Sequence, residues 1–214
     1  MQRECIELAG ADRVVTMDLH SPQIQGFFKK PVDHLFALPI LCDYIKDLKL
    51  DNYIVVSPDA GFAKEARKFA HNLGTSVAIG DKTRKAHDEK AEVLDIIGDV
   101  EGKNALIVDD FTISGGTLVN LAEALKARGA KKIIACLSHL LLTKEGLKRL
   151  ENSPIDLLIS TDSVENQNIV SSNKIRIISV APLFAESIKR IHNRESLSPL
   201  FEKVPKEVFK KSII

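Results

Sequence analysis

The sequence predicts an α/β protein in which a mostly parallel sheet is flanked by helices. Three observations support this fold class. Short apolar runs rich in branched side chains alternate along the chain with segments whose apolar residues have helical spacing. Acidic residues follow several of these runs, and the carboxyl ends of parallel strands are where α/β sheets bind ligands. The segment from Asp109 to Thr117 is acidic and rich in glycine, and it joins one apolar run to a helical pattern.

The predicted elements alternate between strand and helix along the chain. The strand-like runs are Arg13–Asp18, Tyr53–Ser57, Ser76–Ile79, Ala105–Val108, Lys132–Cys136, Leu157–Ser160 and Arg176–Val180. The helical patterns fall near Ala37–Leu48, Phe62–Leu73, Leu118–Arg128 and Leu183–His192. Such alternation indicates crossover connections and a mostly parallel sheet. The chain has no internal repeat and no long linker.

Composition limits the classes of function. With 214 residues and 44% hydrophobic content, the chain can bury one core, or one core and part of a second. Thirty basic residues nearly balance 29 acidic ones, which argues against nucleic acid or a membrane as a partner. The cysteines Cys5, Cys42 and Cys136 are odd in number and widely spaced, which argues against a disulfide framework or a zinc site. The same cysteine pattern favours a reducing cytoplasm, and no apolar run has the length of a signal core or membrane span, so we do not expect secretion.

The segment from Asp109 to Thr117 is the strongest candidate site. It follows a predicted interior strand and opens a predicted helix, so the backbone N–H groups of Ser114 to Thr117 and the positive end of the helix dipole can hold a phosphate. Asp109 and Asp110 would repel that phosphate, so they fit ribose hydroxyls or a Mg²⁺ ion better. The segment therefore predicts a site for a phosphorylated sugar, and the alternative is an ordinary acidic turn between strand and helix.

The segment from Gly80 to Lys90 is densely charged and has no apolar face. Its composition predicts a mobile, exposed loop between two β elements. Lys82 and Arg84 are then two cations available to a transferring phosphoryl group, because phosphoryl transfer depends mainly on charge stabilisation. The alternative is a solvated hairpin tip with no function.

Two more acids follow predicted strands. Asp18 and His20 end the first strand, and alternate side chains of an extended chain point to the same side, so both could reach one metal ion or one phosphate. A purely structural role is the alternative. Asp59 follows Pro58 near the start of a helix, where an aspartate also serves as a cap. The other five histidines, His34 among them, show no ligand spacing and receive no role.

The loop from Asp109 to Thr117 resembles the ribose-phosphate binding loop shared by type I phosphoribosyltransferases and ribose-phosphate pyrophosphokinases. Further segments follow the order and spacing of the pyrophosphokinases in particular, and together they cover nearly the whole chain. They are residues 18–28, 31–35, 56–61, 81–84, 109–117, 149–153 and 179–193.

This resemblance implies a type I phosphoribosyltransferase-like fold and a reaction in which ATP and ribose 5-phosphate give AMP and phosphoribosyl pyrophosphate. It implies that His20 binds the Mg²⁺ of the nucleotide and that Asp59 holds a second metal near the ribose, with Asp18 as a further candidate ligand. Lys82 and Arg84 match catalytic positions that stabilise the pyrophosphoryl group in transfer.

The same resemblance assigns the sugar site. Asp109 and Asp110 match the residues that hold the ribose hydroxyls. The residues that wrap the 5-phosphate correspond to Ile113, Ser114, Gly115, Gly116 and Thr117. Two positions depart from the family pattern: Ile113 stands where many members carry an aspartate, and Lys29 stands where an acid is common.

The resemblance also implies a domain organisation. Residues 1–36 match the end of an N-terminal phosphoribosyltransferase-like domain, most of which the chain lacks together with its ATP-site motifs. Residues 37–196 match a complete C-terminal domain, and 197–214 form a C-terminal tail. We expect ATP, ribose 5-phosphate and Mg²⁺ as ligands, and either a homo-oligomer or association with full-length synthetase.

Two other functions compete with this interpretation. The first is a non-catalytic regulatory or binding subunit that keeps the sugar-phosphate site and associates with full-length enzyme. The second is a nucleobase phosphoribosyltransferase. The last is disfavoured because the segment from Asp18 to Asp33 has no role in such an enzyme.

Overall fold

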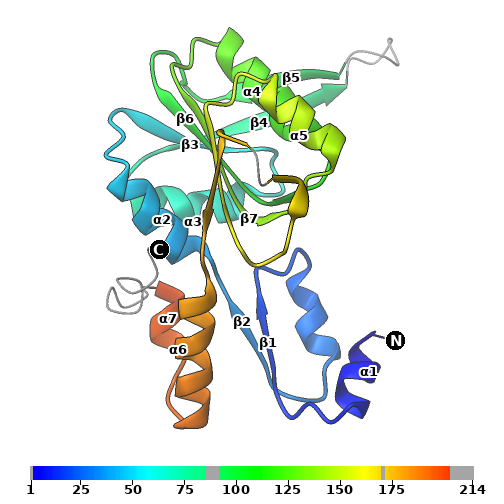
Figure 1. The fold of residues 1–214 in the computed structure, drawn as a ribbon. Coiled ribbons are helices and arrows are strands. Elements are labelled where there is room, and N and C mark those ends of the chain that lie inside the picture. The colour runs from blue at the N-terminus through cyan, green and yellow to red at the C-terminus, as the bar shows by residue number, and fades with distance from the viewer. Residues whose placement is uncertain (1, 85–91, 170–171, 203–214) are drawn as a thin grey trace. The chain divides into compact units, whose positions relative to one another are not determined.

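The computed structural model describes residues 2–84, 92–169 and 172–202 (Figure 1). The chain forms two compact units. The larger unit is Leu41–Ser179, and the smaller unit combines Met1–Ile40 with Val180–Ile214.

The larger unit is built on a seven-stranded sheet with the strand order β5-β4-β3-β6-β7-β8-β9. All neighbouring strands pair in parallel except β4 and β5, which are antiparallel. The predicted fold class, a mostly parallel sheet flanked by helices, is therefore confirmed. The strands are β3 (Tyr53–Ser57), β4 (Val77–Arg84), β5 (Glu92–Ile97), β6 (Asn104–Thr112), β7 (Ile133–Leu140), β8 (Leu157–Thr161) and β9 (Ile175–Ile178).

Helices cover this sheet. The helix α3 packs against β3, β4 and β6, whereas α4 packs against β5, β6 and β7. Figure 1 shows α4 and α5 side by side, and these two helices are in contact. The left-handed backbone of Gly74 ends α3, because a residue without Cβ adopts a φ of +67° at little cost. The helices are α2 (Leu38–Asp47), which spans the boundary between the units, α3 (Ala63–Leu73), α4 (Gly116–Ala127), α5 (Lys144–Glu151) and a short 3₁₀ helix, η2 (Gln167–Ile169).

Both faces of the sheet are buried. Successive side chains along each strand point to opposite faces, so neighbouring residues enter different sides of the core. Val56 and Ile107 belong to the core that includes Leu121 of α4. Val55 and Leu106 are also fully buried but lie outside that core cluster, as expected for residues that point to the opposite face. Apolar runs without alternation are therefore typical of these strands.

The smaller unit contains a two-stranded parallel sheet, in which Val14 pairs with Val32. Arg13 forms an ion pair with Asp33 across these strands. Phe36 packs edge-to-face against Phe201, with ring centroids 6.0 Å apart. The elements of this unit are α1 (Gln2–Leu8), β1 (Val14–Met17), the 3₁₀ helix η1 (Pro22–Phe27), β2 (Val32–Leu35), α6 (Ala181–His192) and α7 (Ser198–Glu202).

The structure corrects several sequence-based predictions. Strand and helix do not alternate strictly among the described residues, because β4 and β5 form an antiparallel pair. Residues 80–84 of the predicted mobile loop belong to β4, where ladder hydrogen bonds hold polar residues in a strand, and residues 85–90 lie outside the described residues. The elements β2 and α5 were not predicted, and β5 was predicted only as a β element after the charged segment, without a residue range. The assignment of residues 1–36, 37–196 and 197–214 to domains stays a prediction.

The cysteines are free, as the sequence predicts. Cys42 and Cys136 are buried, and burial raises the pKa of the Cys42 thiol to about 12, so it stays protonated at neutral pH. Within the described parts of the chain, no helix has the length and apolar character needed to cross a membrane.

Candidate functional site

Three acids gather at the carboxyl edge of the large sheet. The strands β3 and β6 are parallel neighbours, with Val56 paired to Ile107, so the residues that follow these pairs leave the sheet core on the same side. Asp59 follows β3, and Asp109 and Asp110 lie in β6. The charge of Asp59 is close enough to contribute to the raised pKa of Asp109. The structure therefore brings together three of the acids that the sequence singles out.

Asp109 lies inside β6, opposite Leu137 of β7, and not after a strand end as predicted. The strand continues to Thr112 because its pairing with β7 continues. Burial is the main reason that the pKa of Asp109 is raised to about 7, and the charges of Asp110 and Asp59 raise it further. The Asp110 N–H, which donates to Asp109 Oδ1 at 2.9 Å, opposes this shift. Without a ligand, this carboxyl group is therefore partly protonated near neutral pH.

The glycine-rich loop leads directly into α4. Gly115 has a φ of +70° and occupies the N-cap position, and Gly116 is the first helical residue. The Gly116 N–H donates to Ser114 Oγ at 3.3 Å, and the Val119 N–H donates to the Gly115 carbonyl. The other N–H groups of a first helical turn have no acceptor within the helix. Because Ser114 and Thr117 are exposed, this turn can donate hydrogen bonds to an anion.

The helix α5, which the sequence analysis missed, supports this loop. The Thr143 N–H donates to the Ile113 carbonyl at 3.1 Å, and the Thr143 hydroxyl accepts from the Gly146 N–H to cap α5. A Cβ on Gly146 would stand 2.9 Å from the Ile113 carbonyl oxygen and 3.2 Å from the Ser114 carbonyl carbon. Only glycine lets α5 lie this close to the loop backbone. The capping threonine was the available sequence signal for this helix.

Ile113 takes part in the loop through its backbone. Its side chain is 50% exposed, while its carbonyl accepts the hydrogen bond from Thr143. The path of the loop at this position is thus held by main-chain contacts. The isoleucine side chain offers no hydrogen-bond acceptor, and the main-chain contact with Thr143 does not depend on it.

Asp59 caps the turn before α3. Its Oδ1 accepts from the Phe62 N–H at 3.0 Å, and its carbonyl accepts from the Ser57 hydroxyl at 2.7 Å. The capping role considered from the sequence therefore has direct support. Within the described residues, Asp59 Oδ2 accepts no hydrogen bond, which leaves this oxygen for a ligand. Gly80 lets β4 approach the same turn, since a Cβ there would stand 2.8 Å from the Pro58 carbonyl oxygen.

Asp18 and His20 belong to the smaller unit. The backbone of Asp18 is left-handed, with a φ of +39°, so the assumption of an extended chain is wrong at this residue. Asp18 Oδ2 accepts from the Ala37 N–H at 2.9 Å. Leu19, between the two predicted ligands, donates its N–H to His34 Nε2 at 2.9 Å. His34 thus shapes this turn, and the sequence carried no signal of this role because only the pairing of β1 with β2 brings it there.

The remaining predicted residues are Lys82 and Arg84. Their backbones pair with Leu94 and Glu92 across the hairpin of β4 and β5, and their side chains lie outside what the structure describes. Over residues 2–84, 92–169 and 172–202, no group of three or more His, Cys, Asp or Glu side chains is placed to hold a metal ion. The carboxylates of Asp59, Asp109 and Asp110 are nevertheless the hard oxygen ligands that suit Mg²⁺, which commonly takes one or two carboxylates and completes its shell with water and substrate phosphates.

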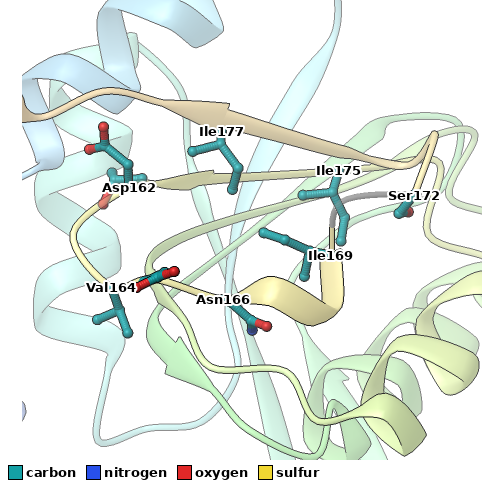
Figure 2. A pocket seen from close by; sticks show the side chains of 9 residues that line it. Asp162, Val164, Asn166, Ile169, Ser172, Ile175 and Ile177 are labelled. Atoms are coloured by element: carbon teal, nitrogen blue, oxygen red, sulfur yellow. The ribbon is translucent and has the colours of Figure 1, made fainter.

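A hollow of about 500 Å³ lies between β9 and the segment that follows β8, away from the acidic site. Figure 2 shows Ile175 and Ile177 projecting from β9 toward the segment that carries Val164 and Ile169. Asp162 and Glu165 add negative charge to its wall, which disfavours a phosphate. None of the residues predicted as functional lines it. It was not foreseen from the sequence.

The site thus places an aspartate pair next to a glycine-capped helix N-terminus on a mostly parallel α/β sheet. The chain belongs to the family of the phosphoribosyl synthetase-associated domain. A family model described as the phosphoribosyl synthetase-associated domain matches residues 83–202, which is more than half of the chain.

Curated relatives extend the likeness beyond that segment. A ribose-phosphate pyrophosphokinase of Clostridium acetobutylicum is 46% identical over 204 residues, which cover 94% of this chain and 64% of the relative. One of Caldanaerobacter subterraneus subsp. tengcongensis is 50% identical over 199 residues, which cover 92% of this chain and 63% of the relative. The chain thus spans less than two thirds of the length of these relatives. The resemblance to ribose-phosphate pyrophosphokinases is confirmed.

A solved structure supports the same conclusion. The phosphoribosylpyrophosphate synthetase of Mycobacterium smegmatis superposes with a TM-score of 0.82 at 34% sequence identity. The match covers 90% of this chain and 62% of the synthetase.

Proposed function

We propose that this chain is a ribose-phosphate pyrophosphokinase polypeptide whose larger unit binds ribose 5-phosphate. The observation that carries the proposal is the arrangement at the end of β6, where Asp109 and Asp110 precede the glycine-capped N-terminus of α4. The N–H groups of Ser114 to Thr117 bind the 5-phosphate, and the two carboxylates accept hydrogen bonds from the ribose hydroxyls. The names of the relatives agree with this ligand.

The proposed reaction is transfer of pyrophosphate from ATP to the C1 hydroxyl of the sugar. The hydroxyl oxygen forms a bond to the β-phosphorus of ATP and gives up its proton, while the bond from the β-phosphorus to the oxygen bridging the α-phosphate breaks. AMP leaves with that oxygen. The loop and the aspartate pair hold the sugar so that C1 faces the nucleotide, and Lys82 and Arg84 offset the negative charge of the transferring group.

The proposed cofactor is Mg²⁺. When bound, it neutralises charge on the phosphates of ATP and helps to orient them. In the larger unit, Asp59 Oδ2 is the proposed ligand near the ribose. In the smaller unit, His20 and Asp18 are the proposed ligands of the nucleotide-associated ion, on a turn whose shape depends on Ala37 and His34.

The wider assignment is part of the same proposal. Residues 1–36 represent the end of an N-terminal phosphoribosyltransferase-like domain, residues 37–196 the C-terminal domain and residues 197–214 its tail. The protein works in the cytoplasm as a homo-oligomer or in association with full-length synthetase. A binding subunit that keeps the sugar-phosphate site without catalysis is the second candidate.

The test compares binding with turnover. Calorimetric titration with ribose 5-phosphate should show binding, and ribose, which lacks the phosphate, should bind much more weakly. Formation of AMP from ATP and ribose 5-phosphate with Mg²⁺ would support the pyrophosphokinase. Binding without AMP formation, together with a stable complex with a full-length relative, would favour the subunit. Absence of ribose 5-phosphate binding would contradict both.

A further inference from the structure

The side chain of Arg149 brings a positive charge to the glycine-rich loop. Arg149 is in α5, and its Nη1 lies 3.4 Å from the point where a Cβ would stand on Gly116. Ser114 Oγ lies 3.5 Å from the same point. The guanidinium group therefore borders the turn from Ser114 to Gly116, and α4 begins at Gly116.

The position of Arg149 follows from the way α5 is fastened to the loop. Gly146 contacts the backbone of Ile113 and Ser114, and Thr143 donates its N–H to the Ile113 carbonyl. Residues three apart on a helix lie on the same face, so Arg149 follows Gly146 along the face that meets the loop. The cation is thus carried by a helix that main-chain contacts hold in place.

The charge of Arg149 lacks a counterpart in the described parts of the chain. There, Arg149 forms neither an ion pair nor a hydrogen bond, although its side chain is exposed. The guanidinium group lies beside the N-terminus of α4, which carries a partial positive charge of about half a unit. Two positive groups next to each other repel, and an anion placed between them would interact favourably with both.

We propose that Arg149 is a phosphate-binding residue of this site. Its guanidinium group donates hydrogen bonds to the phosphate of the bound sugar phosphate from the α5 side, while backbone N–H groups of α4 donate from the other. This inference rests on the proposed function, since it adds a contact to the same ligand. A planar guanidinium group suits a phosphate because it can donate two parallel hydrogen bonds.

The test is calorimetric titration of the full chain with ribose 5-phosphate at several salt concentrations. Arg149→Ala should weaken binding by about threefold to tenfold, as expected for a partly exposed charge pair. Arg149→Lys should recover part of the loss because it keeps the charge. Lys148→Ala is the matched control, since Lys148 is also exposed and basic and is the adjacent residue of α5, and it should bind like the unaltered chain.

The salt dependence separates a charge contact from a structural effect. Affinity of the unaltered chain should fall more steeply with salt than that of the Arg149→Ala variant, because that variant has one cation fewer at the phosphate. Equal affinities and equal salt dependences for these two proteins would overturn the inference while leaving the proposed function intact. Absence of binding by the unaltered chain would overturn the proposed function, and the inference with it.

Discussion

Replacement of Asp109 by asparagine should stabilise the protein above neutral pH. The amide oxygen of the new side chain can still accept the hydrogen bond from the Asp110 N–H, so the local geometry is kept. The change removes a carboxylate that burial makes costly to ionise, since the pKa of Asp109 is raised from 3.8 to about 7. At about 1.4 kcal/mol per pKa unit, this shift of roughly three units sets an upper bound of about 4 kcal/mol on the cost.

The sign of the pH dependence follows from linkage. The folded state binds the proton of Asp109 more tightly than the unfolded state, so this group contributes stability in full only below pH 3.8. That contribution declines as pH rises and is lost once pH exceeds about 7. The asparagine variant has no such group. The difference in unfolding free energy between variant and parent should therefore grow in favour of the variant between pH 5 and pH 8.

Urea denaturation followed by circular dichroism at intervals between these pH values measures this difference. Asp51→Asn is a suitable control, because Asp51 is exposed and its carboxylate forms no hydrogen bond within the described residues. The control should track the parent at every pH. A difference between Asp109→Asn and the parent that does not change with pH would refute the reasoning. The same variant should bind ribose 5-phosphate at least about tenfold more weakly, since a charged acceptor for the ribose hydroxyls is lost.

Substitutions at Gly146, His34, Lys82 and Arg84 test other parts of the site. Gly146→Ala should lower the unfolding free energy by about 1–3 kcal/mol and weaken ribose 5-phosphate binding, because the new Cβ meets the Ile113 carbonyl oxygen; normal binding would argue against support of the loop by α5. His34→Ala should cost about 1–3 kcal/mol in urea denaturation by leaving the Leu19 N–H without its acceptor, and His34→Gln, which keeps an acceptor, should cost less. If the chain forms AMP, Lys82→Ala and Arg84→Ala should each lower kcat with little change in ribose 5-phosphate affinity; an equal loss of affinity would contradict their catalytic role.

Local sequence was sufficient where an element carries its own signal. The helix near Phe62–Leu73 was predicted to within one residue of α3, because its apolar spacing is regular and a glycine ends it. The strand Tyr53–Ser57 agrees with β3 at both ends. By contrast, β2 is only four residues long and contains Asp33 and His34, so its pattern does not resemble an apolar strand.

In the candidate site, too, only the part that is continuous in sequence was predictable. The segment from Asp109 to Thr117 has its acids, glycines and following helix in one continuous stretch. Gly146 and Arg149 lie about thirty residues further along the chain, and only the packing of α5 brings them to the loop. Likewise, the left-handed backbone at Asp18 results from contacts with Leu35 and Ala37, which a local reading of the chain does not contain.

The most direct test is calorimetric titration of the intact chain with ribose 5-phosphate and, in parallel, with ribose. The quantity compared is the dissociation constant of each sugar. The account predicts saturable binding of ribose 5-phosphate and binding of ribose at least about a hundredfold weaker, because a phosphate held by several N–H groups contributes about 3 kcal/mol or more. Equal affinities for the two sugars, or no binding of either, would contradict the assignment of the loop after Asp110 as a phosphate site.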